Sequence, residues 1–495
     1  MKYIGIDLGT SAVKLQLTEA DGRIVAAESR AYGVRYPHPG WSEQDPADWK
    51  TAVFDGIRAL VKKHGGADIA AIAAAGQMHG LVTLDAEDRV LRPCILWNDG
   101  RSAKETAWLN AHFGKRLPEM TANIAFPGFT APKILWMKNN EPQLFEKIAK
   151  IMLPKDYINY LLTGVHACDY SDAAGMLLLD VKNKRWSPEM LEACGITEAQ
   201  LPRLFESADV IGTVKPEVAS ALGLPENTAV AAGAGDNAAA AVGNGVAADG
   251  ACNLSIGTSG TVFIAADRFC MDEQNALHCF CSASGGWHLL GCMLSAAACN
   301  GWFAGNILGE TDFAALQAAI DPALPGRNPV FFLPYLSGER SPLNDVNARA
   351  CFIGLGSDTS KEQMLLAVLE GVAFNFRQIL DSAGALRPTE SFVCGGGAKS
   401  SLWLRILANV TGVRLLVPEN EQGPAMGASI LAMTAAGAFP DVKTACGALF
   451  ANRKLKAVIE PDPALQALYD ERYQVFLRLY PALKPVFPLL QNKLE

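Results

Sequence analysis

The chain has 495 residues, of which 50% are hydrophobic and 19% are charged. This length predicts two or three domains, and the composition excludes a disordered chain. The 43 basic and 51 acidic residues give a net charge of −8 without a basic stripe for nucleic acid. No apolar run approaches the roughly 20 residues that span a bilayer, and Asp7 stands where a signal peptide would be apolar. We therefore expect a cytoplasmic protein that binds neither nucleic acid nor membrane.

Apolar runs rich in β-branched residues alternate with longer stretches of helical period, which indicates an α/β fold. Residues 6–15 and residues 254–263 repeat one pattern, a strand, a Gly-Thr-Ser turn and a second strand. Two such hairpins far apart in the chain predict duplicated domains that each open a sheet with one hairpin. We place the division at residues 1–246 and 247–495.

The two hairpins differ in one possible functional group, because the carboxylate of Asp7 in the first corresponds to the hydroxyl of Ser255 in the second. Backbone N–H groups and hydroxyls of a Gly-Thr-Ser turn can cradle phosphate oxygens, and a carboxylate beside them suits a hard cation. A single copy would be an ordinary hairpin, but two copies with one acid favour phosphate chemistry. The residues expected at phosphate are Thr10, Ser11, Gly257 and Thr258.

Residues 229–241 predict a strand, a glycine turn and an alanine-rich helix with Asp236 at its start. The segment by itself favours a helix N-cap, a position that aspartate often occupies. The alternative is a general base, since α/β sheets bind ligands at the carboxyl ends of their strands.

A third glycine cluster, residues 395–397, stands between a predicted strand and a predicted helix. Its spacing fits neither the Walker A loop nor GxGxxG. Glycines nevertheless allow a ligand to approach the backbone closely, and we expect nucleotide contacts at Gly396, Gly397 and Ser400.

Polar residues also gather after two strands of the first half. Met78 and His79 follow the strand 69–75, and Trp97, Asp99 and Arg101 follow the strand 94–96. Hydroxyl-binding groups beside an aromatic ring are typical of a sugar pocket. The alternatives are a structural histidine and a plain ion pair between Asp99 and Arg101.

Together these segments resemble a known superfamily. Residues 7–11, 235–237, 254–260 and 395–397 resemble, in order, the phosphate-1, catalytic, phosphate-2 and adenosine segments of the sugar-kinase, Hsp70 and actin superfamily. Within it the chain resembles the FGGY family of carbohydrate kinases, whose two signatures fit residues 130–136 and 354–370. Segments such as 40–46, 153–157, 171–175 and 333–340 resemble the family members that act on D-xylulose. The resemblance reaches to about Gly437.

The resemblance implies two actin-like (ribonuclease H-like) domains with an interdomain cleft, ATP mainly on the second and the sugar mainly on the first. It implies that Asp236 is the base, that Asp7 organises Mg²⁺, and that Met78 and His79 touch the sugar. The expected reaction is ATP-dependent phosphorylation of D-xylulose at its terminal hydroxyl. L-ribulose, gluconate, L-fuculose and glycerol remain alternative substrates.

Two other classes of function share this core. A chaperone of the superfamily would need a peptide-binding module, for which the roughly 55 residues after Pro440 are too few. A catalytically inactive binding protein is disfavoured because Asp7 and Asp236 are both present. The expected partner is a small sugar, with a homodimer left open, and the glycine-rich stretch 243–250 is the expected hinge.

Overall fold

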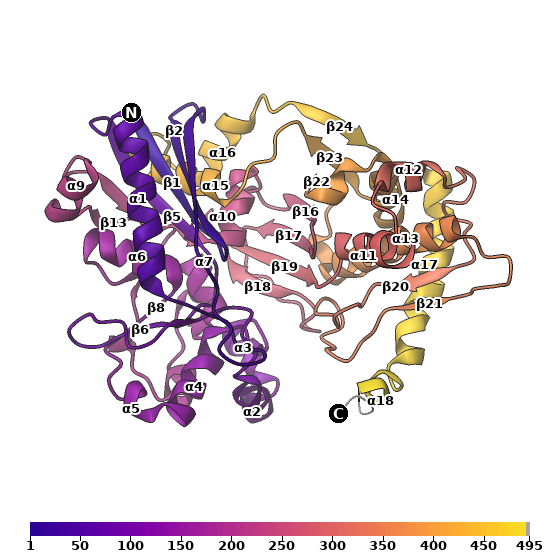
Figure 1. The fold of residues 1–495 in the computed structure, drawn as a ribbon, viewed down its shortest axis with the longest axis horizontal. Helices are drawn as coiled ribbons and strands as arrows, with labels where there is room; N and C mark the ends of the chain where they lie inside the picture. Colours follow the sequence, from indigo (N-terminus) through magenta and orange to yellow (C-terminus); the bar gives the residue numbers. More distant parts are fainter. Residues whose placement is uncertain (492–495) are drawn as a thin grey trace.

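The computed structural model describes residues 1–491, which form two halves built around two seven-stranded sheets (Figure 1). The first sheet has the order β13-β14-β5-β1-β2-β3, with β15 also paired to β5. Its strands are β1 (Lys2–Leu8), β2 (Ala12–Glu19), β3 (Ile24–Ala31), β5 (Ile69–Gly76), β13 (Val210–Thr213), β14 (Ala229–Ala231) and β15 (Ala234–Gly235).

The second sheet has the order β18-β19-β17-β16-β22-β23-β24. Its strands are β16 (Cys252–Ile256), β17 (Gly260–Ala266), β18 (His278–Cys281), β19 (Trp287–Met293), β22 (Glu390–Cys394), β23 (Arg414–Pro418) and β24 (Leu455–Ile459). The predicted α/β class is therefore confirmed, with one mixed sheet in each half.

Both predicted hairpins exist and occupy the same place in their sheets. Strands β1 and β2 pair antiparallel with Asp7 opposite Lys14, and β16 and β17 pair antiparallel with Ser255 opposite Thr261. Each first strand also has a parallel neighbour, β5 for β1 and β22 for β16. The sequence echo thus reflects a repeated arrangement of three strands.

Alternating side chains divide the first sheet between two cores. On one face Ile4, Ile6 and Leu8 pack with helix α1 (Pro46–His64) and helix α6 (Pro154–Thr163). The other face carries Tyr3 and, from β5, Ala71, Ala73 and Ala75, which pack with helix α10 (Asp236–Gly243) and helix α15 (Pro424–Ala435). Small side chains on this face let the two helices lie close to the strands.

Helix α15 comes from the second half of the sequence but packs on the first sheet (Figure 1). A Cβ atom on Gly5 of β1 would lie 2.1 Å from the carbonyl oxygen of Ala425 in this helix, so the contact requires glycine. Helix α16 (Val442–Phe450) joins the same core, and the chain then returns to the second sheet as β24. The two halves therefore share a helical layer.

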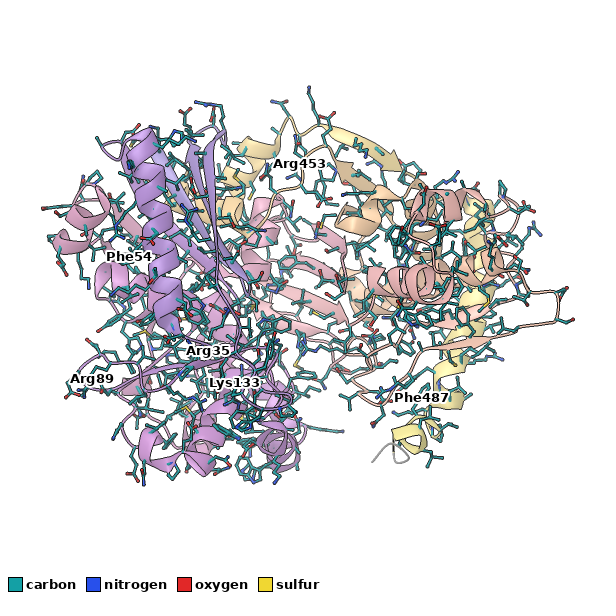
Figure 2. All side chains as sticks on the ribbon, viewed as in Figure 1. Arg35, Phe54, Arg89, Lys133, Arg453 and Phe487 are labelled. Carbon is teal, nitrogen blue, oxygen red and sulfur yellow. The ribbon has the colours of Figure 1, made fainter. Side chains whose placement is uncertain are left out.

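The chain crosses between the halves at residues 244–251, 419–423 and 451–454. Arg453, seen at the upper edge between the halves in Figure 2, donates a hydrogen bond from Nη1 to the carbonyl of Asn244 at 2.6 Å. The predicted hinge stretch thus lies beside two further crossings.

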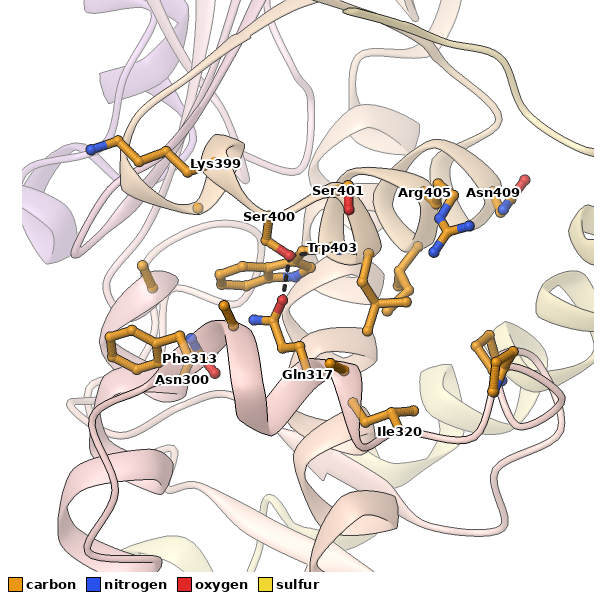
Figure 3. A pocket seen from close by; sticks show the side chains of 18 of the residues that line it. Asn300, Phe313, Gln317, Ile320, Lys399, Ser400, Ser401, Trp403, Arg405 and Asn409 are labelled. Atoms are coloured by element: carbon orange, nitrogen blue, oxygen red, sulfur yellow. Dashed lines mark hydrogen bonds between the residues drawn. The ribbon is translucent and has the colours of Figure 1, made fainter.

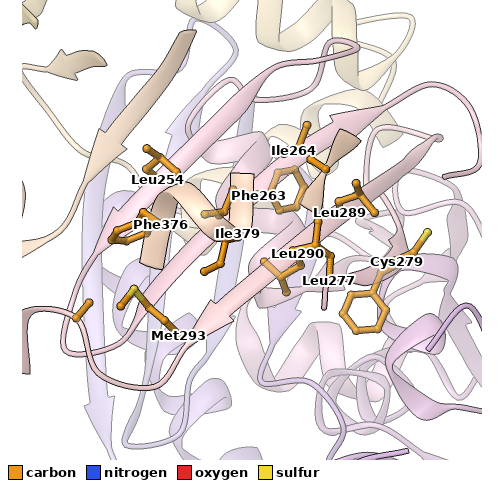
Figure 4. Packing of buried hydrophobic residues seen from close by; sticks show 14 of the residues in the cluster. Leu254, Phe263, Ile264, Leu277, Cys279, Leu289, Leu290, Met293, Phe376 and Ile379 are labelled. Atoms are coloured by element: carbon orange, nitrogen blue, oxygen red, sulfur yellow. The ribbon is translucent and has the colours of Figure 1, made fainter. Parts of the chain in front are cut away.

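The second sheet is covered by helices α13 (Lys361–Ser382) and α14 (Ser401–Thr411), and helix α17 (Pro463–Leu483) packs against α14. Figure 4 shows how Leu254, Phe263 and Leu290 of the strands meet Phe376 and Ile379 of α13. Helix α17 buries Tyr469, Tyr473 and Phe476 against this half, so the segment after Pro440 completes the core.

All twelve cysteines are free, and most are buried, as expected from their apolar surroundings. Among residues 1–491, none of the helices combines the length and hydropathy needed to cross a membrane.

Candidate active site

The helix that carries Asp236 begins at that residue, and Gly235 occupies the N-cap position. The interpretation of Asp236 as the N-cap is therefore wrong. Its Oδ1 accepts hydrogen bonds only from the neighbouring Asn237, from the backbone N–H at 2.7 Å and from Nδ2 at 3.0 Å. Across the part of the chain that the structure describes, Oδ2 accepts no hydrogen bond. One oxygen thus remains free to meet a ligand.

Asp7 lies close enough to Asp236 for its charge to act on the second carboxyl group. Asp7 lies at the end of β1, and Asp236 directly follows β15, which pairs with the end of β5 next to β1. Burial raises the pKa of Asp7 to about 6, although Lys14 opposes the shift. Burial and then the charge of Asp7 raise the pKa of Asp236 to about 7. The two carboxyl groups therefore titrate near neutral pH.

His79 follows the end of β5 in a left-handed backbone conformation, with φ of 70°. Its carbonyl accepts hydrogen bonds from Lys133 Nζ at 2.8 Å and Thr130 Oγ1 at 3.1 Å, which hold this unusual geometry. Its Nδ1 lies 2.7 Å from the carbonyl of Gly175. Burial lowers the pKa of His79 to about 3, so the ring is neutral, Nδ1–H donates, and Nε2 is left as an acceptor.

Glycines make room for Met78 and His79 beside the aspartate. A Cβ on Gly175 would lie 2.7 Å from His79 Nδ1, and one on Gly235 would lie 2.9 Å from Met78 Cγ. The Sδ of Met78 is also 3.9 Å from Asn237 Nδ2. The structure thus brings Met78 and His79 next to the start of the Asp236 helix.

The three predicted sugar contacts that follow strand β7 (Cys94–Ile95) differ in exposure, because one is exposed and two are buried. Trp97 is 46% exposed and donates from Nε1 to Thr10 Oγ1 at 3.0 Å. Asp99 and Arg101 instead form a fully buried ion pair of 2.7 Å. Arg101 also pairs with Glu43 at 2.8 Å and lies over the Trp41 ring at 3.7 Å. We therefore withdraw Asp99 and Arg101 as sugar contacts, because their polar groups are occupied within the protein.

The two Gly-Thr-Ser turns present hydroxyls in different ways. Thr10 is held, since its Oγ1 also donates to Gln77 Oε1 at 3.2 Å. Ser11 and Thr258 are exposed. The carbonyls of Gly257 and Thr258 accept from Ala297 N at 2.8 Å and Ala296 N at 2.9 Å, which ties the second turn to the chain after β19.

A pocket of about 800 Å³ lies in the second half beside the third glycine cluster (Figure 3). Gly396 and Gly397 line it, and Ser400 caps α14 by accepting from Trp403 N at 3.0 Å. Ser400 Oγ also donates to Gln317 Oε1 across the pocket (Figure 3). This hydroxyl is thus already engaged, whereas the glycine backbone is open to a ligand.

A buried charge cluster behind Asp236 was missed by the sequence analysis. Lys155 Nζ lies 2.6 Å from Asp156 Oδ1, 2.9 Å from Asp169 Oδ1 and 3.7 Å from Asp172 Oδ2, all fully buried. Ser171 Oγ donates to Asp169 Oδ2 and accepts from Gly235 N at 3.1 Å. The cluster therefore anchors the residue that precedes Asp236. Its only sequence signal was the resemblance of the segments 153–157 and 171–175.

The second half also reaches the neighbourhood of His79, which the sequence did not reveal. Asn123 of the first half meets His278 Nδ1 at 3.0 Å and donates to the carbonyl of Cys279 at 2.8 Å. Rings of His79, Phe129 and Phe280 lie within 4.7 to 6.3 Å of one another. Strand β18 thus forms part of the wall around His79.

Comparisons with known proteins agree with this architecture. Models of the FGGY family of carbohydrate kinases match residues 2–243 with the N-terminal domain and residues 252–436 with the C-terminal domain. The chain belongs to the FGGY family of carbohydrate kinases.

Individual relatives extend along nearly the whole chain. A xylulose kinase of Escherichia coli strain K12 is 43% identical over 98% of this chain and 99% of its own length. A crystal structure of a xyloylose kinase from Brucella ovis superposes with a TM-score of 0.93 at 43% identity, covering 98% of this chain and all of that one. A gluconate kinase from Lactobacillus acidophilus reaches a TM-score of 0.91 at 29% identity, covering 99% of both chains.

Proposed function

We propose that this chain transfers the terminal phosphoryl group of ATP to the C5 hydroxyl of D-xylulose, giving D-xylulose 5-phosphate and ADP. The choice of sugar is supported by the xylulose kinase that aligns with 98% of this chain at 43% identity. The reaction is supported above all by Asp236, whose pKa of about 7 and unengaged oxygen suit a general base.

Asp236 takes the proton of the C5 hydroxyl as the bond between O5 and phosphorus forms. The bond from phosphorus to the bridging oxygen breaks, and its electron pair leaves with ADP. A carboxyl group with a pKa near 7 is about half ionised at pH 7, and its carboxylate is more basic than that of an ordinary aspartate. Positioning and charge stabilisation contribute the rest of the rate.

The sugar binds on the first half, between Met78, His79 and Trp97. His79 Nε2 accepts a hydroxyl hydrogen, because Nδ1 is committed to Gly175. Met78 supplies an apolar surface for the carbon chain.

ATP lies across both halves. The turns at Thr10, Ser11, Gly257 and Thr258 offer backbone N–H groups to its phosphates, and the exposed Ser11 and Thr258 also offer hydroxyls. Its adenosine occupies the pocket at Gly396, Gly397 and Ser400.

Asp7 is the residue that would hold Mg²⁺, with phosphate oxygens of ATP as the other ligands. The donor set fits, since Mg²⁺ usually takes one or two carboxylates and completes its shell with substrate phosphates and water. Residues 1–491 contain no group of three His, Cys, Asp or Glu side chains that could hold a metal alone. When bound, the ion offsets the negative charge of the phosphates.

The test is ADP release against a panel of D-xylulose, L-ribulose, gluconate, L-fuculose and glycerol. D-xylulose should give the highest kcat/KM. Gluconate is the main rival, because a gluconate kinase shares the fold almost completely. A clear preference for gluconate or glycerol would overturn the sugar and leave the kinase reaction standing.

A further inference from the structure

Arg340 stands in the second half, but its side chain lies at the aromatic wall around His79. The guanidinium carbon is 4.8 Å from the centre of the Phe126 ring. That ring lies 5.6 Å from Phe129 and 5.2 Å from His278, and Phe129 is 4.7 Å from His79. After burial itself, the charge of Arg340 contributes to lowering the pKa of His79 and His278. A cation thus faces the proposed sugar pocket from the half opposite to Met78 and Asp236.

The backbone that carries Arg340 is firmly anchored. Glu339 Oε1 accepts from the N–H groups of Arg340 at 2.9 Å and Leu294 at 2.8 Å, and its Oε2 accepts from Asn375 Nδ2 at 2.9 Å. Ser341 N donates to the carbonyl of Cys292 in β19 at 2.8 Å. The segment is therefore fixed to the sheet and to α13, which is the rigid support that a ligand-binding side chain needs.

Arg340 differs in its surroundings from two buried cations near the pocket, Arg101 and Lys155. Arg101 is neutralised by Asp99 and Glu43, and Lys155 by three aspartates. For Arg340, none of the carboxylates in residues 1–491 lies within ion-pair distance. Its side chain is close enough to the Cys292 thiol to share a hydrogen bond with it. The remaining planar donors are left for a group that is not part of the chain.

The chemistry of the proposed substrate supplies such a group. A five-carbon 2-ketose closes its ring through the C5 hydroxyl, so phosphorylation at O5 requires the open chain with a free carbonyl at C2. A guanidinium donates hydrogen bonds and accepts none, which suits a carbonyl oxygen better than a hydroxyl. Three carbons separate the carbonyl carbon from the reacting oxygen, so a group that binds the carbonyl meets the other end of the open chain. Arg340 lies at the aromatic wall around His79.

We propose that Arg340 binds the C2 carbonyl oxygen of the open-chain ketose and thereby selects ketoses over polyols. This inference rests on the proposed function. It also gives the second half a direct contact with the sugar.

The experiment compares the wild type with Arg340→Gln, Arg340→Lys and the control Arg349→Gln. Arg349 belongs to the same segment, but its Nη1 bonds only to carbonyls of its own loop. For each protein, kcat/KM is measured with D-xylulose, the inhibition constant is measured with xylitol, which has a hydroxyl at C2, and ATP hydrolysis is measured without sugar.

Arg340→Gln should lower kcat/KM for D-xylulose about 10- to 150-fold, the range for a lost charged hydrogen bond. In Arg340→Gln, the inhibition constant of xylitol and the rate of ATP hydrolysis without sugar should stay at wild-type values. The kcat/KM of Arg340→Lys should lie between those of Arg340→Gln and the wild type. Arg349→Gln should match the wild type in all three measurements. Equal losses on all three readouts would assign Arg340 to phosphate or to stability and overturn the proposal. An unchanged kcat/KM would overturn it as well.

The proposed function is tested by the substrate preference of the wild type. The role of Arg340 is tested by the ratio of kcat/KM in the variant to kcat/KM in the wild type. If another ketose proves to be the substrate, the same ratio is measured with that ketose and its polyol. If the preferred substrate has no carbonyl, the proposal for Arg340 fails with the sugar.

Discussion

The hairpins β1–β2 and β16–β17 have the same pairing and the same Gly-Thr-Ser turn, but only the first carries a carboxylate. Asp7 is buried with a pKa raised to about 6, whereas Ser255 at the equivalent position is neutral. The strands beside them differ in the same way: β5 leads to Met78 and His79, and β22 leads to glycines at a pocket. One backbone arrangement therefore supports two chemistries, which are decided by a few residues at the strand ends.

The largest expected effect comes from Asp236→Asn, which keeps the size of the side chain and removes the base. We expect kcat to fall about 10²- to 10⁴-fold, the usual contribution of a general base, with no loss of melting temperature. The matched control is Asp462→Asn, because Asp462 is a true N-cap that accepts from Ala464 N at 2.8 Å. Full activity in Asp236→Asn would remove Asp236 from the chemistry.

The second effect tests the asymmetry of the hairpins. Asp7→Asn should raise the Mg²⁺ concentration for half-maximal rate at least about 10-fold, because even the loss of an outer-shell partner lowers metal affinity about 10- to 100-fold and Asp7 is proposed as a direct ligand. Ser255→Ala, at the equivalent place in the second hairpin, should leave this concentration unchanged. Equal responses of the two variants would show that the hairpins do not differ in metal binding.

The third effect concerns the packing that distinguishes β1 from β16. Gly5→Ala would force α15 away from the sheet, because a Cβ would meet the Ala425 carbonyl oxygen at 2.1 Å. We expect a loss of about 1–3 kcal/mol in the free energy of unfolding, measured by denaturant titration. Gly33→Ala is the control, since nothing lies within 4 Å of a Cβ there. Equal stability of both variants would contradict the shared helical layer.

The smallest effect is a pH dependence. With a pKa of about 7 for Asp236, kcat/KM should rise through pH 7 and level off above it, because only the ionised carboxylate accepts a proton. A group whose pKa is raised on folding stabilises the protein below its unfolded pKa and loses that contribution as pH rises through the folded one. Asp236→Asn should therefore be more stable than the wild type at pH 8 and equal near pH 4. A flat rate profile across pH 7 would exclude Asp236 as the titrating base.

Local patterns were sufficient for the hairpins, the three glycine turns and the strand-end positions of Asp7, Met78, His79 and Asp236. These features depend on the alternation of apolar and polar residues, on turn-forming residues and on order along the chain. All of these can be recognised from neighbouring residues. The same patterns were ambiguous about Asp236, because a cap and a base look alike until the hydrogen bonds of the helix are known.

The sequence by itself determined the fold class, the duplicated hairpins and the segments that end at the site. Only the tertiary structure decided that Asp99 and Arg101 are consumed in a buried ion pair, that Ser400 caps a helix, and that α15 packs on the opposite half. It also brought Arg340 to a wall built mainly from residues more than 200 positions earlier. The physical reason is that burial, pairing of charges and the raised pKa values depend on contacts between distant segments, which no local pattern records.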